Sequence, residues 1–174
     1  MPDQSLSRFK LDSPWGAVHA ALGPRGLVAL ALPRGGQKAL AAVLARRAPG
    51  AETQPVDPES TVAGRQLAGY LAGRSKRLGA PVDLEGLPDF TRRVLEVVRA
   101  IPYGQTRSYA EVAAAADNPR AARAVGQVMN KNPVPLFIPC HRVVGADGSL
   151  VGFGSGLALK RALLAMEAGG RGPR

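Results

Sequence analysis

A segment near the middle of the chain, LGAPVDLEGLPD (78–89), most limits what this sequence can fold into. It holds two prolines and two glycines, residues that interrupt both helices and strands. A chain of 174 residues has room for two small domains. We therefore predict a supporting domain over residues 1–80, a second domain over residues 89–168, and a disordered basic tail over residues 169–174.

The first half of the chain alternates strand-like and helix-like patterns. The run SPWGAVHAALGPRGLVALALP (13–33) has two short apolar stretches around Gly-Pro-Arg-Gly, which predicts a hairpin turning at 23–26. The Ala- and Leu-rich run 38–50 predicts a helix that Pro and Gly end, and a second helical run spans 61–71. This is the pattern of a small α/β domain, and it contains no recognisable functional site.

The second half is mainly helical in pattern. Residues 90–100 have apolar side chains at helical spacing. Ser108 with Glu111 three residues later predicts a capping box at the start of a short helix. A further helix is predicted over Pro119–Asn130, with Asn118 as its N-cap. Two helices joined so closely favour a helix-turn-helix. We expect an α+β protein: a small N-terminal α/β domain and a mainly helical C-terminal domain.

The predicted helix 119–130 has two distinct faces. Val125 and Met129 point inward, whereas a polar stripe lies beside small residues on the other face. That face comprises Arg120, Arg123, Gln127, Lys131, Ala124 and Gly126. A charged stripe is by itself most often a solvated surface. However, the chain has 23 Lys plus Arg against 13 Asp plus Glu, a formal charge of +10, which favours DNA as its partner.

The last part of the chain contains the single cysteine, and we expect a strand, a hairpin and a helix around it. The apolar run VPLFIP (134–139) predicts a short buried strand that leads into Cys140. Residues 142–153 have two apolar runs, which predict a hairpin turning around Asp147. A Gly-rich loop then precedes a helix over 157–167. Glu167 falls beside the apolar stripe of that helix, and a half-buried carboxylate needs a partner.

Cys140 admits three interpretations. A lone cysteine is most often a small core residue. A metal site is weakly supported, because only His19 and His141 accompany the thiol and no paired ligand spacing exists. The third interpretation is a nucleophile, for which His141 could act as base and Arg142 could supply a positive field. Since neighbours on a strand point to opposite faces, we expect a bridging water or a turn, with Glu167 orienting the imidazole.

Three segments resemble one known family. RAVGQVMNKNP (123–133), PCHRVVG (139–145) and, upstream, IPYGQTRSYAEVA (101–113) are similar to the signature of the O6-alkylguanine-DNA alkyltransferases, also called methylated-DNA-protein-cysteine methyltransferases. The similarity is dense over residues 90–167 and loose before them. It implies repair of DNA without a cofactor, in which a damaged guanine is flipped from the duplex and its O6-alkyl group moves once onto Cys140.

The resemblance also implies roles for individual residues. His141, through water, and Glu167 would form a proton relay, while Asn132 braces the turn. Tyr109 would assist the departing guanine. Arg123 would fill the vacated place in the base stack from the minor groove, next to small Ala124 and Gly126. The implied site also includes Val143 and Ser155 in the substrate pocket and Arg120 and Gln127 on the DNA.

Some features depart from that family or leave alternatives open. The loop Phe153–Gly156 (FGSG) replaces the paired glycines common there, so pocket shape and the hydroxyl contact from Ser155 are less determined. Without a Cys and His cluster in the first half, we expect no metal. Competing functions are a helix-turn-helix regulator, a non-catalytic lesion-binding relative and a thiol redox sensor. With no apolar run of about 20 residues and no secretory signal, we expect a cytoplasmic monomer that does not bind membranes.

Overall fold

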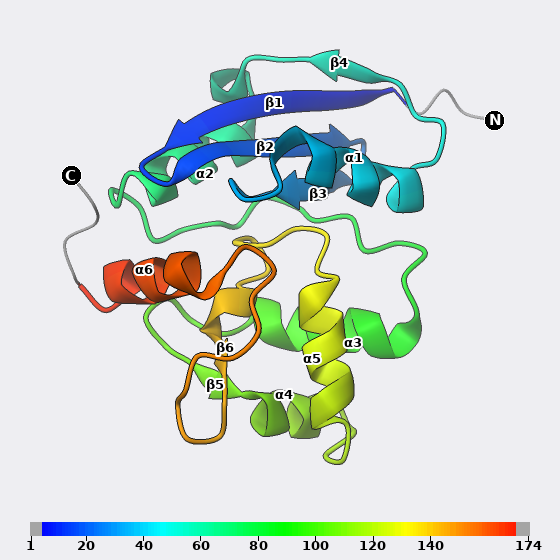
Figure 1. The fold of residues 1–174 in the computed structure, drawn as a ribbon. Helices are drawn as coiled ribbons and strands as arrows, with labels where there is room; N and C mark the ends of the chain where they lie inside the picture. The colour runs from blue at the N-terminus through cyan, green and yellow to red at the C-terminus, as the bar shows by residue number, and fades with distance from the viewer. Residues whose placement is uncertain (1–4, 170–174) are drawn as a thin grey trace. The chain divides into compact units, whose positions relative to one another are not determined.

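The computed structural model describes residues 5–169 and divides the chain into two compact units, Met1–Gly86 and Leu87–Arg174. Helices and strands together make an α+β protein, as expected (Figure 1). Within the described residues, no helix is long and apolar enough to cross a membrane. The tail prediction concerns residues 169–174, of which 170–174 lie outside the described residues.

The first unit is built on a four-stranded sheet in the order β3-β2-β1-β4. Its strands are β1 (Leu6–Ser13), β2 (Gly16–Gly23), β3 (Gly26–Ala31) and β4 (Thr53–Pro55). The expected hairpin is confirmed as β2 and β3, which turn between Gly23 and Gly26. Sequence reasoning did not find β1, an inner strand that pairs antiparallel with β2 and parallel with β4.

Two helices cover the opposite faces of this sheet (Figure 1). They are α1 (Gly36–Arg47) and α2 (Val62–Leu71), and both confirm the helices expected from sequence. Leu40 of α1 packs against Ala21, Ala29 and Ala31 of β2 and β3, where small side chains allow close approach. A short 3-10 helix, η1 (Pro58–Ser60), leads into α2, whose N-cap Thr61 accepts a hydrogen bond from Gly64 N.

Part of the proline- and glycine-rich segment is fixed to the first unit. Leu27 N donates to Pro81 O at 2.9 Å, and Asp83 N donates to Leu27 O at 2.8 Å. The guanidinium of Arg47 donates to the carbonyls of Asp83 and Glu85. Val82 therefore forms an isolated parallel bridge with Leu27 at the β3 edge of the sheet, although the composition of this segment alone suggested a plain connection.

Over the residues that the structure describes, the second unit contains four α-helices, one 3-10 helix and a small two-stranded sheet. The helices are α3 (Asp89–Arg99), α4 (Tyr109–Ala115), α5 (Ala122–Asn130) and α6 (Leu157–Glu167), and the strands are β5 (Arg107–Ser108) and β6 (Val143–Val144). The capping box between Ser108 and Glu111 is present at the start of α4. The bounds of α6 coincide with those expected from its sequence. Whether α4 and α5 act as a helix-turn-helix stays a prediction.

The start of α5 was predicted wrongly. The helix begins at Ala122 rather than Pro119, and Ala121 occupies its N-cap position without a side-chain hydrogen bond. Residues 118–121 instead form a turn in which Ala121 N donates to Asn118 O at 3.0 Å. Asp117 adopts a φ of 61°, which redirects the chain before the helix can begin. Arg120 consequently lies in the turn and not on the helix.

Two strand predictions near Cys140 were also wrong. Residues 134–139 form a buried turn rather than a strand, with Leu136 at a φ of 74°. Residues 142–153 do not form a hairpin. β6 pairs in parallel with β5 from much earlier in the chain. The carbonyl of Val151 accepts side-chain hydrogen bonds from Tyr109 and Lys160 instead of joining a ladder.

Gly64 offers a test of packing in the first unit. An added Cβ would overlap the carbonyl oxygen of Pro58. We expect Gly64→Ala to lower the free energy of unfolding by about 1–3 kcal/mol because of this overlap. Without an overlap, replacing glycine by alanine inside a helix normally raises the free energy of unfolding by about 0.5–1 kcal/mol. Thermal unfolding of the full chain measures this. Gly79→Ala is the control, because nothing lies within 4 Å of its Cβ position; equal melting temperatures for the two variants would contradict the packing argument.

Candidate active site around Cys140

Cys140 opens a single 3-10 turn, η2 (Cys140–Arg142), in the second unit. The turn is followed directly by β6, so its position is fixed by pairing with β5. Cys140 is 6% exposed and His141 is 0% exposed. The helical turn lets the side chains of Cys140 and His141 point in directions that a strand would not permit. This is the turn that we expected from the sequence as an alternative to a bridging water.

The buried loop before the cysteine is held by Asn132. Its side-chain Nδ2 donates to Ile138 O at 2.9 Å, and its Oδ1 accepts from Val134 N at 3.0 Å. One amide group thus closes both ends of the loop that precedes Pro139 and Cys140. The Asn132 side chain also acts to lower the pKa of the Cys140 thiol, against the effect of burial.

Glu167, at the end of α6, is the centre of a buried charged cluster. Its Oε1 lies 2.8 Å from Nε2 of His141 and 2.7 Å from an Arg142 guanidinium nitrogen, while its Oε2 accepts from Arg142 Nε at 2.8 Å. The carboxylate side chain is 0% exposed. The partner that the sequence required for this carboxylate is therefore supplied by both His141 and Arg142.

The turn after α3 completes the surroundings of this cluster. Gly104 N donates to Glu167 Oε2 at 3.3 Å, and Arg142 donates to Ile101 O at 2.6 Å. The Arg142 guanidinium carbon lies 5.7 Å from the ring centroid of Tyr103. Gly104 has a φ of 78°, and a Cβ there would approach the Glu167 carbonyl, which favours glycine at this position.

The expected role of Arg142 differs from its observed role. We anticipated that it would supply a positive field to the thiol, but its side chain is committed to Glu167 and Ile101. Because the guanidinium neutralises the carboxylate, the imidazole of His141 need not be protonated to satisfy Glu167. Burial is the largest influence on His141 and lowers its pKa. A neutral imidazole can accept a proton.

Burial raises the pKa of the Cys140 thiol above its ordinary value. Four groups act in the opposite direction and favour the thiolate: the Asn132 amide, the charge of Lys160, and the two backbone amides of Cys140 and His141. Since burial dominates, the resting group is a neutral thiol surrounded by groups that stabilise its anion.

Lys160 was not identified from the sequence. It is 0% exposed, and its Nζ donates to Val143 O at 2.6 Å and to Val151 O at 3.1 Å. Its spacing in the sequence could have revealed this. Lys160 lies three residues before Leu163 and seven before Glu167, which places it on the same inward face of α6. A buried lysine needs such partners, and here it ties β6 to the following loop.

Tyr109 reaches the same loop from the first residue of α4. Its hydroxyl donates to Val151 O at 2.8 Å, and burial followed by the charge of Cys140 raises the pKa of its phenol. Tyr109 is therefore a hydrogen-bond donor near the sulfur. Val143 is fully buried, whereas Ser155 is half-buried in the loop before α6.

The residues predicted to bind DNA lie apart from this buried cluster. Arg123 and Gln127 are exposed on α5, Ala124 and Gly126 are half-buried, and Arg120 is exposed in the preceding turn. A Cβ on Gly126 would lie 3.9 Å from the Tyr109 ring, so α5 and Tyr109 are neighbours. Within the described residues, no three His, Cys, Asp or Glu side chains gather to hold a metal ion.

Comparison with known proteins identifies the family of this chain. Residues 89–169 match the family model for the DNA binding domain of 6-O-methylguanine DNA methyltransferase. A methylated-DNA-protein-cysteine methyltransferase from Methanosarcina acetivorans is 46% identical over 105 residues, which are 60% of this chain and 67% of that protein. The chain belongs to the methylated-DNA-protein-cysteine methyltransferase family. The constitutive Bacillus subtilis methyltransferase is 43% identical over 63% of this chain and 67% of its own.

Solved structures extend the similarity to the whole chain. The Mycobacterium tuberculosis O6-methylguanine methyltransferase is 34% identical, with a TM-score of 0.77 over 97% of this chain and 96% of its own. A structure of the M. tuberculosis protein OGT in complex with DNA has a TM-score of 0.75 at 34% identity, over 94% and 93% of the two chains. All the residues that form the cluster around Glu167 fall within the methyltransferase domain matched above.

The state of the thiol in this methyltransferase can be tested directly. Because burial raises the pKa of Cys140, we expect its reaction with iodoacetamide to keep accelerating beyond pH 8.5, the approximate pKa of a free thiol. Intact mass after timed exposure reports the rate, since the chain has only one cysteine. Glutathione serves as the free-thiol reference. A rate that already levels off near neutral pH would mean that the resting group is a thiolate.

Proposed function

We propose that this protein repairs DNA by moving the alkyl group of O6-alkylguanine onto Sγ of Cys140, once per protein molecule. The observation that carries the proposal is the single thiol next to a buried His141–Glu167 pair, within a domain of the methyltransferase family. The product is a thioether, which has no route back to the thiol within this site. Repair would therefore be stoichiometric and would need no cofactor.

The proposed transfer begins with removal of a proton from the thiol. The sulfhydryl proton passes through a water molecule to neutral His141, whose Nε2 is already occupied by Glu167, so the relay reaches the ring at Nδ1. The sulfur then attacks the alkyl carbon, and the bond between that carbon and O6 breaks. The groups that favour the thiolate, including Asn132 and Lys160, stabilise the sulfur while it is charged.

The departing guanine carries the electrons of the broken bond. Tyr109 is placed to assist it, because its raised pKa keeps the phenol protonated and its hydroxyl already donates to the Val151 carbonyl. In the proposed step the hydroxyl turns from that carbonyl to the base. Val143 and Ser155 belong to the proposed pocket wall. The guanine anion takes a proton from the Tyr109 hydroxyl, and the imidazolium proton, passed on through solvent, restores the phenol. The proton lost by the thiol thus ends on the base, and the products are unmodified guanine and alkylated Cys140.

The DNA surface in this proposal is α5 and the turn before it, acting with α4 as a helix-turn-helix. Arg123 would enter from the minor groove and occupy the space of the flipped base. Ala124 and Gly126 allow the backbone to approach the duplex, while Arg120 and Gln127 contact the phosphates and sugars. The charge of +10 supplies general attraction to the polyanion. We expect the protein to act as a monomer in the cytoplasm.

A second candidate is a lesion-binding protein that performs no transfer. Such a protein would need the DNA surface but not the reactive thiol. A buried single thiol beside the His141–Glu167 pair has no purpose in that function. The structure of the site therefore favours transfer.

The decisive experiment is to mix the purified protein with duplex DNA carrying O6-methylguanine and to weigh the protein intact. We expect a gain of one methyl group on Cys140, in a ratio of one per protein, and none for Cys140→Ser. Unmethylated duplex is the control. Tight binding to the lesion without any gain in mass would establish the non-catalytic alternative.

The role of Arg123 is tested by comparing two DNA substrates. We expect Arg123→Ala to slow transfer from duplex DNA by about tenfold or more, because unstacking a base costs a few kcal/mol, and to slow transfer from single strands much less. Arg120→Ala is the matched variant, since loss of a phosphate contact weakens binding to duplex and to single-stranded DNA alike. An equal effect of Arg123→Ala on duplex and single strands would exclude the role of filling the base stack.

A further inference from the structure

The first unit contains a groove that the proposed repair reaction does not use. It lies between strand β1 and helix α1, encloses about 400 Å³, and is termed here the β1–α1 groove. Its lining comprises Arg8, Phe9, Lys10, His19, Gln37, Leu40, Ala41, Leu44, Thr53, Pro55 and Val56. This volume falls within the range of small-ligand sites, about 300–1,000 Å³.

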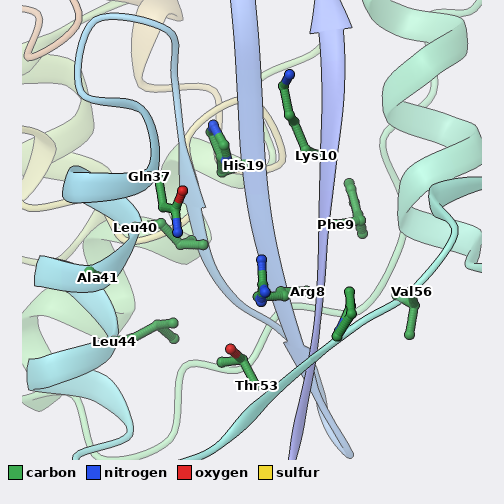
Figure 2. Close-up of a pocket in the computed structure, with 11 residues that line it drawn as sticks. Arg8, Phe9, Lys10, His19, Gln37, Leu40, Ala41, Leu44, Thr53 and Val56 are labelled. Carbon is green, nitrogen blue, oxygen red and sulfur yellow. The ribbon is translucent and has the colours of Figure 1, made fainter.

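The arrangement of strands explains why the groove is open. α1 packs over β2 and β3 through Leu40 and the alanines beneath it. On β1, Leu6 is buried in a cluster with Leu44 of α1, whereas Arg8 and Lys10 on the same face stay exposed. Successive residues of a strand alternate between faces. Arg8 and Lys10 accordingly share the face turned towards α1, while Phe9 is buried on the other face (Figure 2).

Three basic side chains meet in this groove. Lys10 lies directly opposite His19 in the register of β1 and β2, and Figure 2 shows Arg8 and His19 on the side of α1. Among the lining residues none carries a carboxylate; α1 contributes Gln37 and β4 contributes Thr53. The carboxylate of Asp12 lies 3.4 Å from Lys10 but is 85% exposed and outside the groove, so it screens the cluster little.

The basic groups repel one another. Burial first, then the charges of Lys10 and Arg8, lower the pKa of His19, and Asp12 opposes them. Like charges that share a site are destabilising, and an anion bound among Arg8, Lys10 and His19 relieves the repulsion that exposed Asp12 offsets only in part. The opposite wall, formed by Leu40, Ala41 and Leu44, is apolar and can hold the uncharged part of a ligand.

We propose that the β1–α1 groove binds an organic phosphomonoester of about the size of a mononucleotide. Arg8 and Lys10 hold the phosphate, because a guanidinium and an ammonium are the side chains best suited to it. Gln37 and Thr53 offer hydrogen bonds to the body of the ligand. The source of the phosphate is either a free nucleotide or the end of a DNA strand. The site is separate from Cys140 and does not depend on the alkyl transfer.

The test is titration of the full chain with thymidine 5′-monophosphate, followed by NMR of the two histidines. We expect the His19 signal to shift and its pKa to rise in the complex, since a bound dianion stabilises the protonated ring. Thymidine without phosphate should not bind. Inorganic phosphate should bind at least about tenfold more weakly. Equal affinity for inorganic phosphate, or no shift of His19 with the nucleotide, would overturn the proposal.

Substitutions in the β1–α1 groove test whether the nucleotide binds there. We expect Arg8→Gln and Lys10→Gln each to weaken nucleotide binding by about tenfold, as for loss of a charge-assisted hydrogen bond. Arg46→Gln is the matched control, because Arg46 is exposed on α1 and does not line the groove. An equal loss in the control would contradict the site.

A 5′-phosphorylated single strand distinguishes the two sources. If Arg8→Gln weakens its binding as it weakens that of the nucleotide, the groove takes a DNA end; if only nucleotide binding weakens, the ligand is the free nucleotide. All these variants should retain methyl transfer, which separates this proposal from that of repair.

Discussion

The second unit depends on one carboxylate that is removed from water. Glu167 joins the end of α6 to the turn that carries Cys140 and, through Gly104, to the segment that follows α3. A buried charge is costly unless it is fully paired, and Arg142 together with His141 supplies that pairing. Loss of either partner would leave an unpaired charge inside the protein. The geometry of the thiol is therefore coupled to the stability of the whole unit.

This pairing also sets the protonation of the site. Arg142 compensates the negative charge of Glu167, and burial lowers the pKa of His141 while raising that of Cys140. Thiol and imidazole are both neutral at rest, which is the less costly state in a buried environment. In the transfer proposed above, a proton would move only when an electrophilic carbon is present, and the neutral thiol would be protected from unproductive reactions until then.

The loop between β6 and α6 is also held by polar side chains from other segments. Lys160 and Tyr109 both donate to the carbonyl of Val151, and Lys160 also holds Val143. This loop cannot form the hairpin expected from its composition, because its backbone is committed to these two side chains. The lysine stabilises both the loop and the nearby sulfur anion, which gives one buried cation two functions.

Much of this protein was determined by local sequence. Capping at Ser108 and Glu111, the Gly-Pro turn between β2 and β3 and the apolar stripe of α6 act over a few residues. The start of α4, the turn of the hairpin and the bounds of α6 could therefore be predicted, and the residues around Cys140 could be recognised. Tertiary structure decided the rest. The pairing of β5 with β6, the partner of Arg142, the burial of Lys160 and the inner strand β1 all depend on segments distant in the chain. The physical reason is that an ion pair or a β-ladder needs a partner whose position no local pattern encodes.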